Sequence, residues 1–214
     1  YVWYKNGSPL GATTPNVAVG SAGSYTVLVT NAAGCQDMSD PVVVTVNPAP
    51  TATITPAGPT TFCEGGGVTL QGPAGMSSYV WYKDGSPLGA TTPNVAVGVS
   101  GSYTVLVTNA AGCTDLSDPV VVTVNPLVTI SSFTAVASTI NLGDTATLNF
   151  TIANGDSWSL ASSIGNTFIP SSGTGNGSLS ATYNANNNTG SDTVTLTVTN
   201  GCGVATRTVV ITVN

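Results

Sequence analysis

Charged residues are scarce in this sequence. They make up 6% of 214 residues, there is no histidine, and nine acidic residues face three basic ones for a net charge of −6. The lack of histidine removes histidine acid–base chemistry and histidine-ligated metals. Nucleic-acid binding needs clustered cations against the phosphates, whereas Lys5, Lys83 and Arg207 are far apart in the sequence. We therefore expect no nucleic-acid partner.

The sequence also lacks long apolar runs. None reaches the roughly 18 residues of a membrane-spanning helix, and no basic stretch followed by an apolar segment marks a signal peptide at the start. Residue 1 is Tyr and lies inside a repeated motif, so we expect a piece of a longer exported protein with no membrane span. Hydrophobic residues still make up 41% of the chain, which is enough for packed cores. Val and Thr dominate, and no segment has the 3.6-residue period of a helix, so the predicted class is all-β.

An internal repeat organises the chain. Residues 1–48 recur at 79–126 without a gap, and only five positions differ: Asn6/Asp84, Ser21/Val99, Ala22/Ser100, Gln36/Thr114 and Met38/Leu116. A fixed period is typical of an array of similar units. Near-identity of neighbouring units favours a repeat that builds length over an enzyme.

The repeat predicts three units. Residues 1–48 are the C-terminal part of one unit, whose first two strands are missing, and residues 49–126 form a complete unit. Residues 127–214 form a divergent relative, in which Trp158 corresponds to Trp81. The linkers around Pro48 and Pro126 are short and contain proline, which favours a stiff end-to-end arrangement.

Strand signals in the complete unit are short and separated by turn residues. Apolar and polar residues alternate in 68–71 and 103–108, and an Asp84-Gly85 turn signal follows 79–83. About seven such strands, a tryptophan on the third and a tyrosine opening the sixth fit an immunoglobulin-like β-sandwich. The predicted fold is therefore tandem immunoglobulin-like β-sandwich domains placed end to end.

The same pattern identifies the core. We expect Leu70, Trp81 and Val105 to pack at the centre without a disulfide, and Tyr103 to form the tyrosine corner. The corresponding positions in the other units extend the list of core candidates: Trp3, Tyr25 and Trp158. A core role explains these aromatic residues better than a ligand role does, because the fold itself requires them.

A family resemblance rests on the segments CEGGGVTL, YVWYKDGSPL, GSYTVLVTNAAGC and VVVTVNP. This pattern resembles the immunoglobulin-like repeats of large bacterial surface adhesins, including the gliding-motility adhesins exported by the type IX secretion system. The resemblance covers residues 1–126 well. Residues 127–214 look like a related immunoglobulin-like or polycystic-kidney-disease-type domain. The resemblance implies an extracellular, cell-surface location.

The four cysteines pose a pairing problem. The obvious pair is Cys63 with Cys113, inside the complete unit. However, Cys63 lies seven residues before Leu70, at the expected start of the second strand, strand B, which holds 68–71. Cys113 lies eight residues after Val105, in the F–G turn after the sixth strand, strand F, which holds 103–108. Strands B and F run in the same direction, so the two thiols would lie at opposite ends of the unit, too far apart for a disulfide.

An interdomain pairing accounts for every thiol. In an end-to-end array a cysteine at the start of strand B can reach the F–G turn of the next unit, which predicts a Cys63–Cys202 disulfide. Cys35 and Cys113 would then pair with upstream repeats, and Asn141 stands where the third unit would need its own cysteine. Free buried thiols are the alternative. Oxidised cysteines fit an exported protein.

Catalytic and metal-binding roles find little support. A Ser–Lys pair using Lys5 or Lys83 is conceivable, but a lysine repeated in a tight turn is typical of a solubilising edge charge. No acid–base constellation is present, so we predict no enzyme and no cofactor. Paired acids at Asp37/Asp40 and Asp115/Asp118 lie near the expected junctions, where Ca²⁺ could bind carboxylates. Turn capping by aspartate is the simpler interpretation.

The third unit contains candidate sites for modification and for binding. Thr145 and Thr193 each follow an Asp and precede an apolar residue, which resembles a bacterial O-glycosylation motif. An N-glycosylation sequon also occurs at Asn149–Thr151, and whether it is used depends on the host organism. Gly165–Asn188 is rich in Gly, Ser and Asn around Phe168 and Tyr183. Such a segment can bind surface glycans by aromatic stacking, or it is a solvated loop.

The sequence thus predicts a structural stalk segment of an extracellular adhesin or filament, which projects a distal binding activity. Its expected partners are neighbouring repeats of the same protein. A carbohydrate- or surface-binding module at 127–214 is the alternative. A second alternative is a strand-exchange fibre, in which another chain completes the first unit by strand addition.

Overall fold

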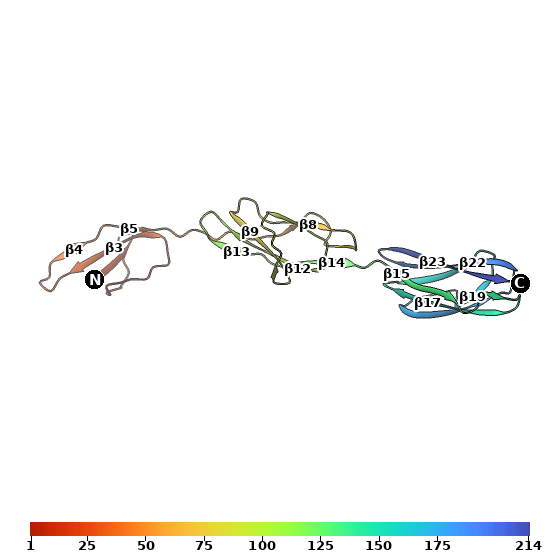
Figure 1. Ribbon diagram of the computed structural model, residues 1–214. Helices are drawn as coiled ribbons and strands as arrows, with labels where there is room; N and C mark the ends of the chain where they lie inside the picture. The colour runs from red at the N-terminus through yellow and green to blue at the C-terminus, as the bar shows by residue number, and fades with distance from the viewer.

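The computed structural model describes residues 1–214, and all of its regular secondary structure is β-strand. Strand pairing divides the strands into three groups, β1–β5, β6–β14 and β15–β23, with no pairing between groups. The groups lie end to end along one direction (Figure 1). We call residues 1–48, 49–126 and 127–214 the first, second and third units. No helix long and apolar enough to cross a membrane occurs.

The second unit has the two facing sheets of a sandwich. One sheet has the order β10-β9-β12-β14-β7, with β13 also on β12, and the other has the order β11-β8-β6. The bounds are β6 (Thr55–Pro56), β7 (Thr61–Cys63), β8 (Val68–Gln71), β9 (Ser78–Lys83), β10 (Ser86–Pro87), β11 (Asn94–Val97), β12 (Gly101–Thr108), β13 (Thr114–Leu116) and β14 (Val120–Asn125).

The core of the second unit holds the residues that the sequence singled out. Leu70, Trp81 and Val105 are fully buried, and Tyr103 is nearly so. Trp81 pairs with Val105 across β9 and β12, and Leu70 faces them from β8 in the other sheet. These residues are brought together because apolar side chains alternate along each strand and point to the same face.

The Tyr103 hydroxyl donates to the carbonyl oxygen of Val99 at 2.7 Å, as expected of a tyrosine corner. Burial raises the pKa of this tyrosine. The Tyr25 hydroxyl makes the equivalent bond, donating to the carbonyl oxygen of Ser21 at 2.8 Å. The corner therefore recurs in both repeats, although Val99 and Ser21 differ in side chain, because the acceptor is a backbone group.

The first unit contains one sheet. Its strands are β1 (Val2–Lys5), β2 (Ser8–Pro9), β3 (Gly23–Thr30), β4 (Gln36–Met38) and β5 (Val42–Val44), in the order β2-β1-β3-β4 with β5 also on β3. Tyr25 is buried, but Trp3 is only half-buried. Trp3 departs from the expected core position because no second sheet covers this face.

The hairpins β1–β2 and β9–β10 show how local sequence sets the turn. Asn6 and Asp84 have φ of 51° and 50°, and the following Gly7 and Gly85 have φ of 82° and 79°. Two consecutive residues with positive φ form the turn whose twist matches a tight hairpin, and Asn-Gly and Asp-Gly favour it. The Asp84-Gly85 signal is therefore a genuine turn.

The third unit is a sandwich with a larger core. Its sheets have the orders β15-β17-β21-β19 and β16-β23-β22-β18-β20. The bounds are β15 (Thr129–Ala135), β16 (Thr139–Ile140), β17 (Thr145–Ala153), β18 (Ser157–Ser162), β19 (Thr167–Ile169), β20 (Ser172–Gly173), β21 (Gly177–Asn184), β22 (Gly190–Asn200) and β23 (Gly203–Val213). Seventeen buried residues pack together here, against ten in the second unit.

Trp158 is buried on β18, opposite Val198 of β22, much as Trp81 is opposite Val105. The two indoles differ in one respect. Trp81 Nε1 donates to the carbonyl oxygen of Thr92 at 2.9 Å, whereas the buried Nε1 of Trp158 has no partner. Gly173 lies so close that an added Cβ would sit 2.7 Å from the Trp158 ring, so only glycine fits at this position.

Candidate functional site

The junction between the second and third units is closed by a disulfide. Cys63 and Cys202 are bonded with their Cα atoms 5.5 Å apart, inside the range that a disulfide allows. The predicted interdomain pairing is therefore confirmed. One detail of the prediction is wrong: Cys63 does not start strand B, because it ends β7 and strand β8 begins only at Val68. Strand β7 instead runs parallel to β14, with Cys63 opposite Asn125.

The alternative Cys63–Cys113 pair is excluded by the positions of its two members. Cys63 lies beside Asn125, at the junction with the third unit. The Cys113 thiol lies 3.7 Å from the carbonyl oxygen of Asn47, at the junction with the first unit. Cys113 and Cys35 are both free, the former half-buried and the latter exposed. Their pairing with upstream repeats stays a prediction.

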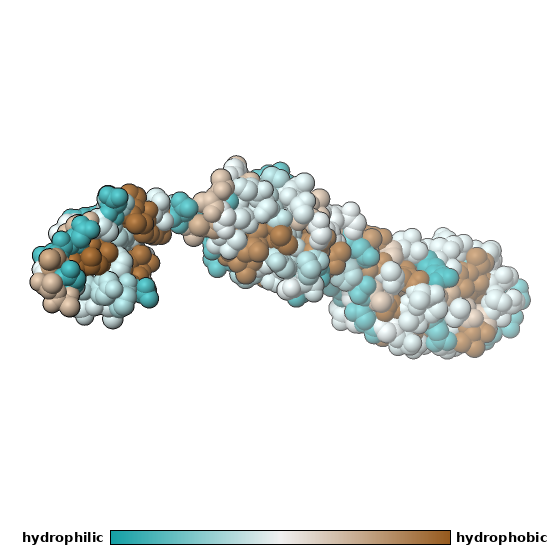
Figure 2. Space-filling model, turned by 60° about the vertical axis from the view of Figure 1, so that its left-hand side comes forward, coloured by the Kyte–Doolittle hydropathy of each residue, from teal (hydrophilic) through white to brown (hydrophobic).

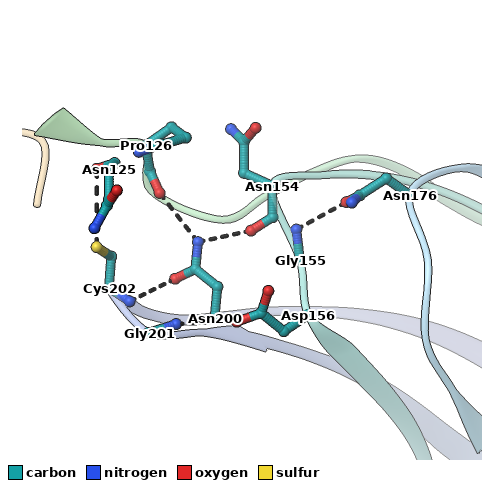
Figure 3. A pocket seen from close by; sticks show the side chains of 9 residues that line it. All are labelled: Asn125, Pro126, Asn154, Gly155, Asp156, Asn176, Asn200, Gly201 and Cys202. Carbon is teal, nitrogen blue, oxygen red and sulfur yellow. Dashed lines mark hydrogen bonds between the residues drawn. The ribbon is translucent and has the colours of Figure 1, made fainter. Parts of the chain in front are cut away.

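Asn200 holds the linker at the closed junction. Its Nδ2 donates to the carbonyl oxygens of Pro126 at 3.0 Å and Asn154 at 2.6 Å, and its Oδ1 accepts the backbone N–H of Cys202 at 2.8 Å (Figure 3). One amide thus connects the linker, the loop after β17 and the disulfide. The Cys202 sulfur lies 3.8 Å from the carbonyl oxygen of Asn125.

Further bonds from the third unit surround this contact. Asn154 Nδ2 donates to the carbonyl oxygen of Leu127 at 3.0 Å, and Asp156 accepts the N–H of Gly201 at 3.2 Å. Asn176 accepts the N–H of Gly155 at 2.8 Å. These groups line a hollow of about 400 Å³ beside the disulfide (Figure 3). The hollow is polar and open, and the side chains of Asn154, Asp156, Asn176 and Asn200 in its lining already bond to the backbone.

The junction between the first and second units repeats the same contacts without a disulfide. Asn109 Nδ2 donates to the carbonyl oxygen of Pro48 at 2.9 Å, and its Oδ1 accepts the N–H of Cys113 at 3.0 Å. Pro48 and Asn47 stand 78 positions before Pro126 and Asn125. Asn109 is therefore structurally equivalent to Asn200, and Cys113 is equivalent to Cys202. The sequence did not reveal these two asparagines as equivalent. Asn109 stands four residues before its cysteine and Asn200 only two, so the two positions do not align.

The acidic pairs considered for calcium do not converge. Asp115 on β13 accepts the backbone N–H of Ala52 at 2.8 Å, which ties the start of the second unit to its own sheet, while Asp118 is exposed. Asp37 accepts the N–H of its own neighbour Met38 at 3.0 Å. No group of three or more His, Cys, Asp or Glu side chains is close enough to hold a metal ion. Asp37 and Asp115 each accept a backbone N–H, which fits the simpler interpretation for one member of each pair.

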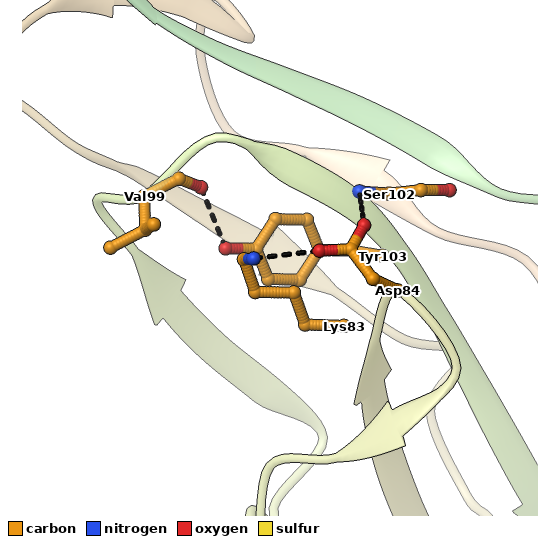
Figure 4. Close-up of polar contacts among 5 residues, drawn as sticks. All are labelled: Lys83, Asp84, Val99, Ser102 and Tyr103. Atoms are coloured by element: carbon orange, nitrogen blue, oxygen red, sulfur yellow. Dashed lines mark hydrogen bonds and ion pairs between the residues drawn. The ribbon is translucent and has the colours of Figure 1, made fainter.

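The lysines of the hairpins take part in surface bonds. Lys83 Nζ lies 2.7 Å from Asp84, whose other oxygen accepts the N–H of Ser102 at 2.9 Å (Figure 4). The bond between them raises the pKa of Lys83, and it lowers that of Asp84 together with the Ser102 bond. Lys5 instead donates to the Ser21 hydroxyl at 2.8 Å, in an exposed position. Ser21 is replaced by Val99 in the second unit, so the Ser–Lys pair is not part of the repeat.

The segment considered for sugar binding is mostly strand. It contains β19, β20 and β21. Tyr183 is fully buried, and Phe168 packs against it edge to face with ring centroids 5.7 Å apart. An aromatic ring must be exposed to stack on a sugar, so the predicted glycan contact through Tyr183 is wrong. Phe168 is half-buried against the third core, and a glycan contact through it stays a prediction.

Asp192 is a buried carboxylate in the same unit. It accepts hydrogen bonds from the hydroxyls of Ser162 at 2.6 Å and Tyr183 at 2.7 Å, and from the N–H of Ser163 at 2.9 Å. Burial acts to raise the pKa of Asp192, but these bonds outweigh it and lower the pKa. Burial, followed by the bond to Asp192, raises the pKa of Tyr183 to about 12. Asn166, also buried, joins the network by donating to the Tyr183 oxygen at 2.6 Å.

The two O-glycosylation candidates differ in their surroundings. Thr145 and Thr193 are both exposed. Asp144, before Thr145, is exposed, whereas Asp192, before Thr193, is buried in the network just described. Modification of either threonine stays a prediction.

Comparison with known proteins supports the fold. The N-terminal eight Ig domains of Down Syndrome Cell Adhesion Molecule align with 98% of this chain and 37% of that one, at 17% identity and a TM-score of 0.55. An I-band fragment of titin aligns with 100% of this chain and 87% of its own, at 15% identity and a TM-score of 0.51. The chain thus spans little more than a third of the first structure. No protein-family model matches the chain, and no curated protein sequence matches it. The chain has the predicted all-β fold of tandem immunoglobulin-like domains.

Proposed function

We propose that this chain is a stalk segment of an extracellular bacterial surface adhesin, and that its units project a distal binding activity from the cell. The observation that carries the proposal is the junction. The same asparagine–linker contact occurs at both junctions, through Asn109 and Asn200, and a disulfide closes one of them. A contact repeated at every junction fixes the direction in which each new unit continues, which is what a spacer requires.

The sequence supports the cellular setting. Residues 1–126 resemble the repeats of gliding-motility adhesins exported by type IX secretion, and a disulfide is stable in an oxidising compartment outside the cell. Partners of this segment are neighbouring repeats of the same protein. The alternative of a carbohydrate-binding third unit has lost Tyr183 as a contact, because this ring is fully buried, and its other candidate ring, Phe168, is half-buried.

Small-angle X-ray scattering on the oxidised chain tests the stalk role, with a glycan array as the second measurement. We expect an elongated particle whose largest dimension equals three units end to end, and no saturable glycan binding. The variant Cys202→Ser should broaden the distribution of dimensions, whereas Cys35→Ser, at an exposed free thiol, should not. A compact particle, or a glycan bound in a saturable way, would contradict the proposal.

A further inference from the structure

The second unit carries apolar side chains on the outward face of its larger sheet. Residues on β9, β12, β13 and β14 alternate between the core and this face. On the outward side, Leu116 is 55% and Val121 63% exposed. An open hollow of about 240 Å³ on this face is lined by Tyr82, Gly85, Thr104, Leu106 and Leu116. We call the apolar residues of this face the outer patch: Val80, Tyr82, Leu106, Leu116 and Val121.

Strand pairing brings most of the outer patch together. Leu106 on β12 lies directly opposite Val80 on β9 and Leu116 on β13, so three apolar side chains form one row across the sheet. Tyr82 follows two residues after Val80 and points to the same side. The other outward residues of these four strands are serine, threonine or asparagine. No charged residue therefore points outward from the strands that carry the outer patch.

The first unit has the same patch in the same register. Leu28 lies opposite Met38 there, as Leu106 lies opposite Leu116 in the second unit. Met38 is 48% and Val43 73% exposed. This face points away from the core, so its exposure does not depend on what covers the inner side of the sheet. The outer patch thus recurs at an interval of 78 residues, and hydrophobic surface is exposed on both units in the view of Figure 2.

The third unit has a hydroxyl-bearing face in the equivalent place. Between their buried residues, β22 points outward with threonines and β18 with two serines and an alanine: Thr193, Thr195, Thr197, Thr199, Ser157, Ser159 and Ala161. Small hydroxyl groups thus stand where the first and second units have large apolar side chains. The outer patch is a property of the repeat and is missing from the third unit.

The chemistry of the outer patch indicates its partner. A cluster of exposed apolar side chains marks a contact surface. The chain has a net charge of −6, which opposes contact between copies, but the outer patch can be covered without taking any charge out of water. A second copy also presents apolar patches at the same 78-residue interval, whereas a partner without this repeat would fit one unit only. The face therefore suits another copy of this chain.

The available area decides how many units take part. Stable protein contacts bury about 800 Å² on each partner. The outer patch of one unit has five side chains, and three of them, Val80, Tyr82 and Leu106, are already half-buried, so one unit falls short of that area. Two patches on one chain act together, because the second contact forms at high local concentration once the first has formed.

We propose that two copies of this chain associate side by side through the outer patches of their first and second units, with the third units left apart. The two surfaces are equivalent and meet face to face about a twofold axis, and the hollow beside Tyr82 receives an apolar side chain of the other copy. The inference goes beyond the stalk role and does not depend on it, because these faces can meet whether or not the chain spaces a distal domain.

Sedimentation equilibrium of the full chain over a range of concentrations tests the inference. The parent chain carries Cys35→Ser and Cys113→Ser, so that no disulfide joins two copies, while the Cys63–Cys202 bond is kept. All variants are made in this parent. Calorimetry should show that each variant stays folded, because every further substitution is at an exposed position.

The variants place a carboxylate in the outer patch of one unit or of both. We expect the parent to form a dimer whose dissociation constant rises about tenfold or more in Leu116→Asp, because the contact would bury an unpaired charge. Met38→Asp should act in the same direction, and the double variant should stay monomeric over the same range. Thr208→Asp is the matched control, at an exposed outward residue of β23 in the third unit, and it should associate like the parent.

Four results would overturn the inference. The first is a parent chain that stays monomeric up to millimolar concentration, and the second is equal weakening of the dimer by Thr208→Asp. The third is a dimer that persists in the double variant, which would assign the contact to another surface, such as the inner side of the first sheet. The fourth is a monomer that binds phosphatidylcholine vesicles through Leu116, which would assign the outer patch to a membrane.

Scattering separates this inference from the stalk role. Two chains side by side double the mass of the particle and leave its largest dimension unchanged. An elongated particle that stays monomeric keeps the stalk role while this inference fails. A dimer of compact particles that is lost in the double variant has the opposite meaning.

Discussion

The two junctions of this chain share an asparagine–linker contact and the position of a cysteine, but only one of them is closed by a covalent bond. At both, an asparagine side chain bonds the linker proline carbonyl, at 2.9 Å for Asn109 and 3.0 Å for Asn200. At both, a cysteine sulfur lies within 3.8 Å of the preceding asparagine carbonyl. Only the second has a disulfide, between Cys63 and Cys202. The comparison indicates that hydrogen bonds set the geometry of the junction and that the disulfide secures it.

The largest expected effect comes from removing that bond. Cys202→Ser should lower the free energy of unfolding by about 4 kcal/mol, because a long cross-link restricts the unfolded chain, and this one joins residues 139 positions apart. Differential calorimetry would show the second and third units melting at lower temperature. Cys35→Ser is the matched control and should leave the curve unchanged. Identical curves for Cys202→Ser and the native chain would mean that the disulfide adds nothing to the junction.

Asp192→Ala tests whether the second and third units, which the closed junction joins, unfold independently. The substitution should destabilise this unit by about 3 kcal/mol, because several buried donors lose their acceptor. The second unit, which has no buried carboxylate in its core, should melt as before. Calorimetry should compare Cys202→Ser with the double variant Cys202→Ser, Asp192→Ala. Without the disulfide, the melting transitions of the second and third units can be followed separately. A shift of both transitions would show that the units are coupled through more than the disulfide.

The pH dependence of the third unit follows from the same network. Hydrogen bonds hold the pKa of Asp192 below its ordinary value of 3.8, so its stabilisation is complete above that value and is lost as the pH falls through the lower folded one. Tyr183 is raised from 10.0 to about 12, so its contribution is present below 10 and is lost as the pH rises towards 12. Melting temperature against pH should fall at both ends. Asp192→Asn should reduce the fall of the melting temperature at acid pH. An unchanged fall would show that other carboxylates cause it.

Asn109→Ala and Asn200→Ala compare the junctions directly. Each should cost about 1–2 kcal/mol of local stability through lost hydrogen bonds. Limited proteolysis should then cut the linker after Pro48 readily in Asn109→Ala, while the linker after Pro126 stays resistant in Asn200→Ala because the disulfide still closes that junction. Equal cleavage of the two linkers would show that the disulfide does not restrain the chain around it.

The smallest expected effect belongs to Asp115→Ala. It removes the acceptor for the Ala52 N–H, a loss worth about 1 kcal/mol. Hydrogen exchange at Ala52 should become a few-fold to about tenfold faster, while exchange at the closed junction stays unchanged. Faster exchange at both junctions would point to long-range coupling along the chain.

The sequence predicted the fold and the disulfide because both depend on repeating patterns. Alternating apolar residues identify the strands around Leu70, Trp81 and Val105, and the direction of these strands places Cys63 and Cys113 at opposite ends of their unit, which leaves Cys202 of the next unit as the partner of Cys63. The strand that carries Cys63 was misplaced, because β7 has only three residues and no alternation that would set it apart from β8.

Contacts between distant polar residues were not predictable in the same way. Asn166, Tyr183 and Asp192 come together only after the loop before β19 packs against β21 and β22, and nothing in the local sequence marks them as partners. The Gly, Ser and Asn residues around Tyr183 suggest a loop, so the local sequence predicts an exposed ring where the structure has a buried one. The junction asparagines bond linkers 61 and 74 residues away, which is a separation that no local pattern encodes.

The Cys63–Cys202 bond also determines how far the chain can be extended by pulling its ends. Tension that enters at residue 63 passes through the sulfurs and leaves at residue 202, so the 139 positions between them bear no force even if both sandwiches unfold. Fully extended, that stretch would add about 460–500 Å of contour length. Reduction of one bond would release this hidden length, so thiol chemistry sets the reach of the oxidised chain.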